Sequence, residues 1–225
     1  MGLFGWFRRK PSVVLLNDKI WLTTAAKLNG VREAIRERVG QDAVVVVAAH
    51  FPASLREVRK HLETTGLSVS LAEGRDAGKQ LFELARRGDT TIVAALVETL
   101  AGLTPPEAVG GEPFRVRFVV GERHLLRTKD DAFLPFAERL TPPGRIGFHL
   151  SLEDPVLRLF AGDWVGDVLR RLGMQESDAV ESRMIARRIR AAQNKIAKLA
   201  VLDRPADSAE EWVRLNCPEL LREDR

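Results

Sequence analysis

The chain has little of what several protein classes require. Its 225 residues include a single cysteine, Cys217, so no internal disulfide can form, and a disulfide-stapled scaffold is excluded. This cysteine usage predicts a reducing, cytoplasmic setting. The most apolar run, 44–49, is far shorter than the roughly 20 residues that a bilayer requires. The sequence therefore predicts no membrane-spanning helix.

Catalytic and metal-binding signatures are also scarce. The sequence has no Gly-x-Ser-x-Gly elbow. Metal-ligand spacing is absent around the four histidines, which are His50, His61, His124 and His149. Segment 74–80 resembles a phosphate loop, but the gap between its glycines is one residue short, and Gln80 replaces the hydroxyl that would hold magnesium. We therefore predict that Lys79 is a solvated residue in the first turns of a helix.

Composition and charge are those of an ordinary globular chain. Hydrophobic residues make up 45% and charged residues 29%, and the net charge is +4, which is too small an excess to argue for nucleic acid. Segment 1–17 begins with aromatic and basic residues, so two interpretations stand. Phe4, Trp6 and Phe7 contact the inner face of a membrane peripherally, or they rest on the domain behind them.

Hydrophobic periodicity predicts an α/β fold. Helices are expected over 23–39, 52–61 and 76–87, and strands over 44–47, 67–71, 90–95, 114–120 and 145–150. Such alternation indicates a parallel sheet with helices on both faces. Asp154, which precedes Pro155, is expected to satisfy the free N–H groups of the next helix rather than to act with Glu153 as an acid–base pair.

Composition shifts after residue 153 and predicts a helical extension. One or two short helices are expected within 154–172, a long helix over 179–201 capped by Ser177 or Asp178, and a last helix over 209–221. The long helix should lie on the domain through an apolar stripe and leave its basic residues in solvent. The stripe is Met184, Ile185, Ile189 and Ile196, and the basic residues include Arg187, Arg190 and Lys198. Trp212, Leu215 and Leu220 of the last helix are expected to fold back over part of the stripe.

Four segments, in matching order, resemble SecA, the motor of bacterial protein export. They are GERH at 121–124, FHLSLED at 148–154, a stretch from LRLF at 157 to LGM at 174, and SRMI at 182–185 continuing to Lys195. The resemblance covers most of 18–200. It implies that 18–153 is a RecA-like domain of the P-loop NTPase and helicase C-terminal type, similar to the second SecA motor domain. Segments 1–17 and 154–225 are then an N-terminal segment and a helical extension.

The departures from the SecA pattern concern its nucleotide-binding parts. ETLAG at 98–102 stands where the family has Gly-Arg-Gly-Thr-Asp. Segment 132–139 aligns with the family's arginines that reach the γ-phosphate, but Phe136 replaces one of them and only Arg139 matches. The first motor domain, the preprotein-crosslinking domain and a tail cysteine cluster have no counterpart in the sequence. Because phosphoryl transfer needs an anion cradle, a metal and a cation in one place, we expect a degenerate ATPase, with Phe133, Leu134 and Phe136 converted to packing surface.

The resemblance implies a SecA-like, ATPase-inactive interaction or accessory module in protein export, without a cofactor. The expected interaction residues are Met184, Ile185, Arg187, Ile189, Arg190 and Gln193, and the expected partner is a protein such as an export component. One alternative is a half-motor that completes an ATP site with a separate phosphate-loop domain, with Arg139 as a remnant arginine finger. Another is a helicase-like nucleic-acid module, although few aromatics interleave with the basic residues to form a stacking platform.

Overall fold

The computed structural model describes residues 12–41, 44–74, 76–85, 91–104, 115–140, 142–161, 164–171 and 173–221. The predicted membrane contact through Phe4, Trp6 and Phe7 lies outside these residues. Within them, no helix combines the length and the apolar character needed to cross a bilayer.

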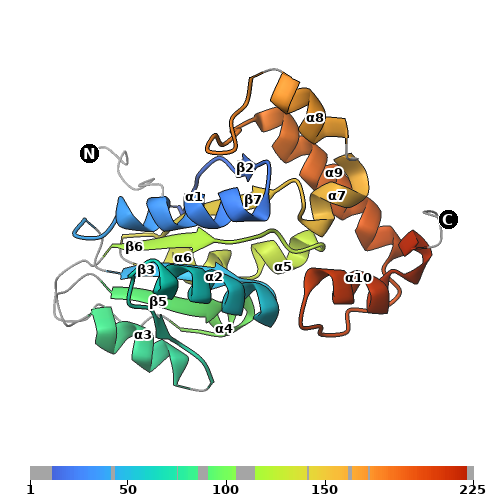
Figure 1. Ribbon diagram of the computed structural model, residues 1–225. Helices are drawn as coiled ribbons and strands as arrows, with labels where there is room; N and C mark the ends of the chain where they lie inside the picture. Colours follow the sequence, from blue (N-terminus) through green and yellow to red (C-terminus); the bar gives the residue numbers. More distant parts are fainter. Residues whose placement is uncertain are drawn as a thin grey trace, which may run out of the picture.

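A parallel sheet forms the centre of the molecule (Figure 1). Its strands are β1 (Val14–Leu15), β2 (Lys19–Trp21), β3 (Val44–Ala49), β4 (Ser70–Leu71), β5 (Thr91–Leu96), β6 (Val116–Val120) and β7 (Arg145–Ser151). The strand order is β1-β7-β6-β3-β5-β4, and β2 pairs with β7 beyond β1. Every one of these pairings is parallel.

Helices cover both faces of the sheet. They are α1 (Thr24–Arg36), α2 (Pro52–Thr64), α3 (Ala77–Ala85), α4 (Val97–Ala101), α5 (Arg127–Asp131), α6 (Leu134–Arg139), α7 (Pro155–Ala161), α8 (Trp164–Arg171), α9 (Arg183–Leu199) and α10 (Ala209–Asn216), with a short 3₁₀ helix, η1 (Pro218–Leu221). Alternate strand residues point to opposite faces, so Val45 and Val47 of β3 pack on α1 and α2. Val44 and Val46 pack on the face that α3, α4 and α6 cover. The predicted α/β fold class, a parallel sheet with helices on both faces, is therefore confirmed.

The order of the strands reverses between β3 and β6. From β3 the chain continues toward β5 and β4, whereas from β6 it continues toward β7. In open α/β sheets, the crevice at the carboxyl ends of two such strands is where ligands bind. His50 and Phe51 follow β3 at this position, and Glu122 and His124 follow β6.

The C-terminal helices differ from prediction at their boundaries. The long helix begins at Arg183 rather than at 179, because Val180 forms an antiparallel bridge with Ile20 at the sheet edge. The Ser182 hydroxyl, not Ser177 or Asp178, caps α9 by accepting from the Met184 N–H. The last helix stops at Asn216 instead of 221, since Pro218 cannot donate a helical hydrogen bond.

The acidic pair before α7 also behaves differently from prediction. The Asp154 carboxylate does not cap its own helix but accepts from the Lys27 ammonium, with Oδ1 2.7 Å from Nζ. Glu153 accepts from the Thr24 N–H at 2.8 Å and so caps the first turn of α1. This hydrogen bond lowers the pKa of Glu153. Both carboxylates therefore hold α1 against the end of β7.

Candidate interaction groove

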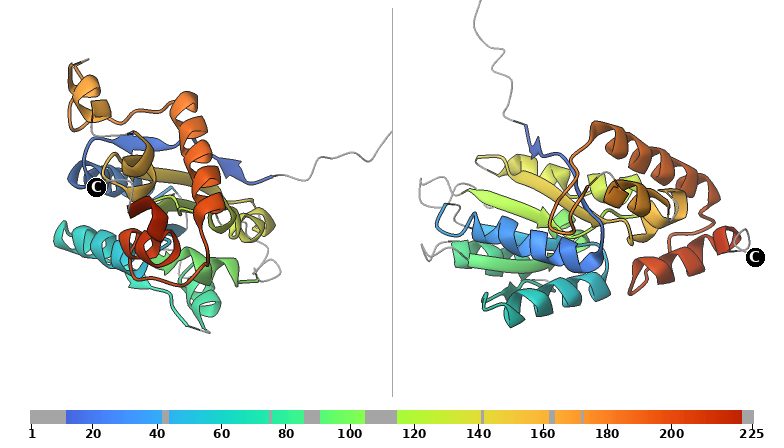
Figure 2. Two further views of the ribbon diagram at one scale, coloured as in Figure 1. Left: turned by 90° about the vertical axis from the view of Figure 1, so that its right-hand side faces the viewer. Right: turned by 45° about the horizontal axis from the view of Figure 1, so that its top comes forward.

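The chain itself fills part of the crevice at the carboxyl ends of β3 and β6, and a cavity of about 460 Å³ that Ser54, Glu122 and Asp154 help to line remains beside the filled part. Phe51, Leu125, Ile196 and Trp212 form one buried apolar cluster with other residues of α10. The His124 ring stacks on Phe51, with centroids 5.1 Å apart, and meets the edge of Trp212 at 5.3 Å. Figures 1 and 2 show α10 seated at this end of the sheet, beside α2.

The predicted back-folding of the last helix is therefore confirmed for two residues. Trp212 and Leu220 are buried in that cluster. Leu215, in contrast, is 37% exposed, because it lies on the outer face of α10. That part of the prediction was wrong.

The start of α2 in the same crevice is held by a buried carboxylate. Glu122 Oε1 accepts from the N–H groups of His50 and Phe51, and Oε2 accepts from the Ser54 hydroxyl at 2.7 Å. A helix N-terminus favours an anion, and here a protein side chain supplies it. Burial raises the pKa of Glu122.

A second polar network lies beside this crevice and was missed by sequence reasoning. Asp130 receives hydrogen bonds from the His124 N–H at 2.9 Å and from the Gln193 amide at 2.7 Å. His50 Nε2 lies 2.8 Å from its Oδ1, and Arg123 lies 3.3 Å from its Oδ2. Burial alone would raise the pKa of Asp130, but the His50 hydrogen bond and the charges of His50 and Arg123 lower it.

The network joins the sheet to α9 and holds no metal site. Among the described residues, no group of three or more His, Cys, Asp or Glu side chains is arranged to hold a metal ion.

The sequence feature that could have predicted this network is the position of its histidines. His50 and His124 both follow buried strands that are neighbours in the sheet. Spacing along the chain could not reveal this contact. The two histidines are 74 positions apart in the sequence, whereas the centroids of their rings are 5.3 Å apart in the structure.

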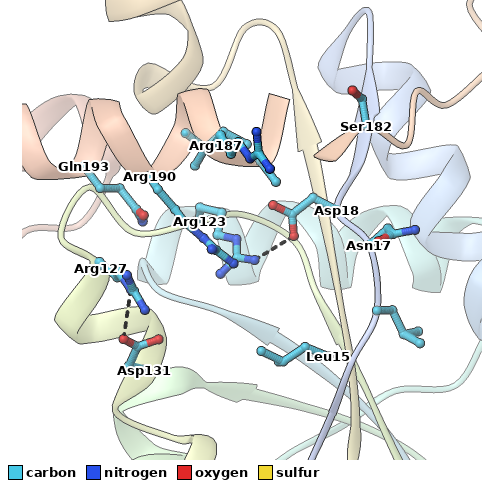
Figure 3. Close-up of a pocket in the computed structure, with 13 residues that line it drawn as sticks. Leu15, Asn17, Asp18, Arg123, Arg127, Asp131, Ser182, Arg187, Arg190 and Gln193 are labelled. Atoms are coloured by element: carbon cyan, nitrogen blue, oxygen red, sulfur yellow. Dashed lines mark hydrogen bonds and ion pairs between the residues drawn. The ribbon is translucent and has the colours of Figure 1, made fainter. Parts of the chain in front are cut away.

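A groove of about 350 Å³ opens between α9, the segment from β1 to β2, and α5 (Figure 3). Leu15, Leu16 and Ile189 supply its apolar lining. Four arginines also line it, namely Arg123, Arg127, Arg187 and Arg190. It is the place where most of the predicted interaction residues meet, and we call it the α9 groove.

Two of the four arginines are neutralised within the protein. Arg123 lies 2.6 Å from Asp18 and rests over the Phe148 ring. Arg127 lies 3.2 Å from Asp131. Within the described part of the chain, no acidic side chain pairs with Arg187 or Arg190, and both are exposed. The uncompensated positive charge of the groove therefore lies on α9.

The predicted interaction residues differ in where the structure places them. Arg187, Ile189 and Arg190 line the groove. Gln193 also reaches it, but the residue is buried and its amide donates to the His124 carbonyl and to Asp130, so we correct its role to that of a structural link.

The beginning of the predicted apolar stripe also needs correction. Ile185 is partly buried against the core, whereas Met184 is 70% exposed. Since α9 begins only at Arg183, Met184 lies in a first turn that projects beyond the sheet. The stripe that contacts the protein therefore runs from Ile185 through Ile189 to Ile196.

Residues aligned with the nucleotide-binding parts have other contacts. Phe133 and Phe136 are buried and pack on the Phe118 ring, with centroids 5.8 and 6.2 Å apart, so the predicted packing surface is confirmed. Arg139 donates to the carbonyls of Leu103 and Pro135, at 3.2 and 3.1 Å. Its guanidinium is thus engaged by the backbone.

The phosphate-loop-like segment behaves as an ordinary helix start. Lys79 lies in the first turns of α3 and is exposed, as predicted. Its ammonium lies 3.8 Å from Glu83 one turn later.

Comparisons with known proteins find SecA. The family model described as "SecA P-loop domain" matches residues 108–177, so this part of the chain is similar to that domain. A SecA translocase subunit of Xylella fastidiosa strain M23 is 29% identical over 211 aligned positions, which cover 80% of this chain and 23% of that protein. A SecA of Stenotrophomonas maltophilia is 31% identical over 157 positions, covering 69% of this chain and 16% of that protein.

The chain aligns with only a part of each SecA protein. The chain spans about a quarter of the length of the SecA proteins that it matches. Among solved structures, the C-terminal part of the Fun30 ATPase domain superposes with a TM-score of 0.43 at 12% identity, covering 76% of this chain and 54% of that one. The segment matched by the SecA family model includes β6, β7 and the crevice residues Glu122 and His124.

Proposed function

We propose that this SecA-related chain is an interaction module that does not bind or hydrolyse ATP by itself. The observation that carries the proposal is the state of the crevice at the carboxyl ends of β3 and β6. Trp212 and its neighbours in α10 fill part of the position where an α/β sheet receives a ligand, and carboxylates including Glu122, Glu153 and Asp154 line the cavity that remains. Lys27 and Arg56 of the same lining are already paired with Asp154 and Asp207, so a triphosphate entering there would lose water without sufficient compensating charge, which is costly.

The arrangement around Arg139 supports the same proposal. An arginine that compensates phosphate charge must direct its donors at the transferring group. Here two donors already meet the backbone carbonyls of Leu103 and Pro135. The buried rings of Phe133 and Phe136 nearby offer no polar group to a nucleotide.

We predict that the purified chain neither turns over ATP nor binds it. The measurement is phosphate release with magnesium and millimolar ATP, together with equilibrium dialysis of labelled ATP. Release should equal the buffer blank, and Arg139→Ala should leave it unchanged. Turnover above the blank that Arg139→Ala abolishes would contradict the proposal and favour a working arginine finger.

The process that we propose is protein export, in which the relatives are translocase subunits. The chain would act from the cytoplasmic side by contacting an export component through the α9 groove. Titration calorimetry with purified SecA tests this directly. Saturable binding that Arg187→Glu weakens and Arg188→Glu leaves intact is the expected result. Absence of binding to any purified translocase component would refute the export role.

A further inference from the structure

The α9 groove carries two uncompensated arginines opposite an aliphatic wall. Arg187 and Arg190 are three residues apart on α9, so they project from one face of the helix. Leu15 lies across the groove from α9 (Figure 3). Leu15 remains 50% exposed and Val14 beside it 43%. Exposed aliphatic surface next to unpaired cations suits a ligand that carries both an aliphatic group and negative charge.

We propose that the α9 groove binds an extended, acidic protein segment in which two carboxylates flank an aliphatic residue. Residues i and i+2 of an extended chain point to the same side, about 6.8 Å apart, which suits the roughly 5–6 Å between Cβ atoms of helical residues i and i+3. The two carboxylates reach Arg187 and Arg190. The residue between them points the other way, toward Leu15.

Charge complementarity selects a carboxylate ligand. Arginine pairs with carboxylates through two parallel hydrogen bonds, and such charge-assisted bonds are stronger than neutral ones. Arg123 and Arg127 contribute little to a ligand, because Asp18 and Asp131 already hold them. Recognition therefore depends on the two arginines of α9.

The same lining disfavours nucleic acid. Single strands need aromatic side chains on which bases stack, and the described lining of the groove holds none. Asp18 and Asp131 would also repel a continuous phosphate backbone, whereas a segment with two spaced carboxylates avoids them.

The test is fluorescence anisotropy with labelled twelve-residue peptides and the full-length chain. The central sequences are Glu-Leu-Glu, Glu-Ser-Glu, Glu-Glu-Leu and Lys-Leu-Lys in one neutral flank, and a twelve-nucleotide thymidine strand is the nucleic-acid probe. We expect Glu-Leu-Glu to bind at least fivefold more tightly than every other probe. Its affinity should fall as salt is raised, because exposed ion pairs are screened.

Matched variants locate the binding. Arg187→Glu and Arg190→Glu should each weaken Glu-Leu-Glu binding at least tenfold. Arg188→Glu, which makes the same charge change on the same helix but lies outside the groove, should change it less than twofold. All three side chains are exposed, so circular dichroism melting should be unchanged. Equal weakening by Arg188→Glu would reveal unspecific charge attraction and overturn the proposal.

Other outcomes also decide the matter. Tighter binding of the thymidine strand, lost in Arg187→Glu, would overturn the proposal in favour of nucleic acid. Equal affinity for Glu-Ser-Glu would remove the role of the aliphatic wall. The inference rests on the proposed interaction function, but the two can fail separately. ATP turnover would refute the proposed function alone, and loss of the preference for Glu-Leu-Glu while SecA still binds would refute only the groove ligand.

Discussion

Lys27 and Asp154 form a buried ion pair that joins α1 to the end of β7. Their charged atoms are 2.7 Å apart, and the two side chains are 8% and 11% exposed. Asp154 also accepts from the N–H and the hydroxyl of Ser151. Burial alone would lower the pKa of Lys27, but the Asp154 charge and hydrogen bond raise it. Lys27 therefore keeps its charge at neutral pH.

Breaking this pair from one side should be costly. Lys27→Met leaves Asp154 charged and buried without its cation, and we expect a loss of about 3–5 kcal/mol in the free energy of unfolding. Urea denaturation measures it. The double variant Lys27→Met/Asp154→Asn should recover part of the loss, because no buried charge remains. A loss below about 1 kcal/mol in the single variant would show that Asp154 finds water instead.

His149 should make stability depend on pH. Burial, helped by the charges of Lys19 and Lys27, lowers its pKa from 6.5 to about 3. The unfolded chain therefore takes up a proton below pH 6.5, while the folded chain stays unprotonated there until about pH 3. The stabilisation is complete above pH 6.5 and is lost as the pH falls toward 3, by about 1.4 kcal/mol per pH unit.

The variant His149→Phe isolates this contribution. It keeps an aromatic ring beside Trp21, on which His149 stacks with centroids 6.2 Å apart, but it cannot titrate. Urea midpoints at pH 7, 6, 5 and 4 should fall less steeply in His149→Phe than in the parent chain. Parallel curves for the two proteins would show that water reaches the His149 ring.

At the scale of elements, the sequence predicted most of the framework. The β-branched run 44–47 indicated a strand buried on both faces, and all of β3 is buried. The prediction failed where tertiary contacts decide a boundary. Val180 is drawn into a bridge with Ile20, a contact between residues 160 positions apart that no local pattern contains. The start of α9, and with it the exposure of Met184, follows from that bridge.

The sequence predicted several residues of the α9 groove, but not how these residues are arranged in space. Helical periodicity placed Arg187, Ile189 and Arg190 on α9 correctly. It could not show that Leu15 lies opposite them, since that depends on β1 pairing with β7. Nor could it show that Gln193 turns inward to Asp130.

The segment after Arg204 is expected to be an essential cover. Removing it uncovers Phe51, Leu125 and Ile196, which pack beneath Trp212 in the present fold, and large exposed apolar patches promote association. A chain truncated after Arg204 should therefore run as larger species in size-exclusion chromatography with light scattering. A chain ending at Leu221 is the matched control and should behave as the full chain does. Unchanged size and melting after truncation at Arg204 would make α10 a loose tail.

At the scale of the whole molecule, one buried network connects the parallel sheet to the C-terminal helices. Asp130 receives hydrogen bonds from His124, after β6, and from Gln193, on α9. The apolar cluster around Trp212 joins the same two parts. The predicted division at residue 153 therefore passes between parts that share a core. We expect them to unfold together.

Gln193→Leu should uncouple the two parts. The variant removes one of several donors to Asp130 and the donor to the His124 carbonyl, and a buried acceptor left without a partner costs about 1–3 kcal/mol. Hydrogen exchange followed by mass spectrometry reads the parts separately. In the parent chain, amides of β3 and α10 should open with the same free energy, whereas in Gln193→Leu those of α10 should exchange faster. Asn194→Leu is the control, since Asn194 is exposed on the same helix, and it should leave both rates unchanged. If α10 already exchanges much faster than β3 in the parent chain, the extension folds independently and the network only docks it.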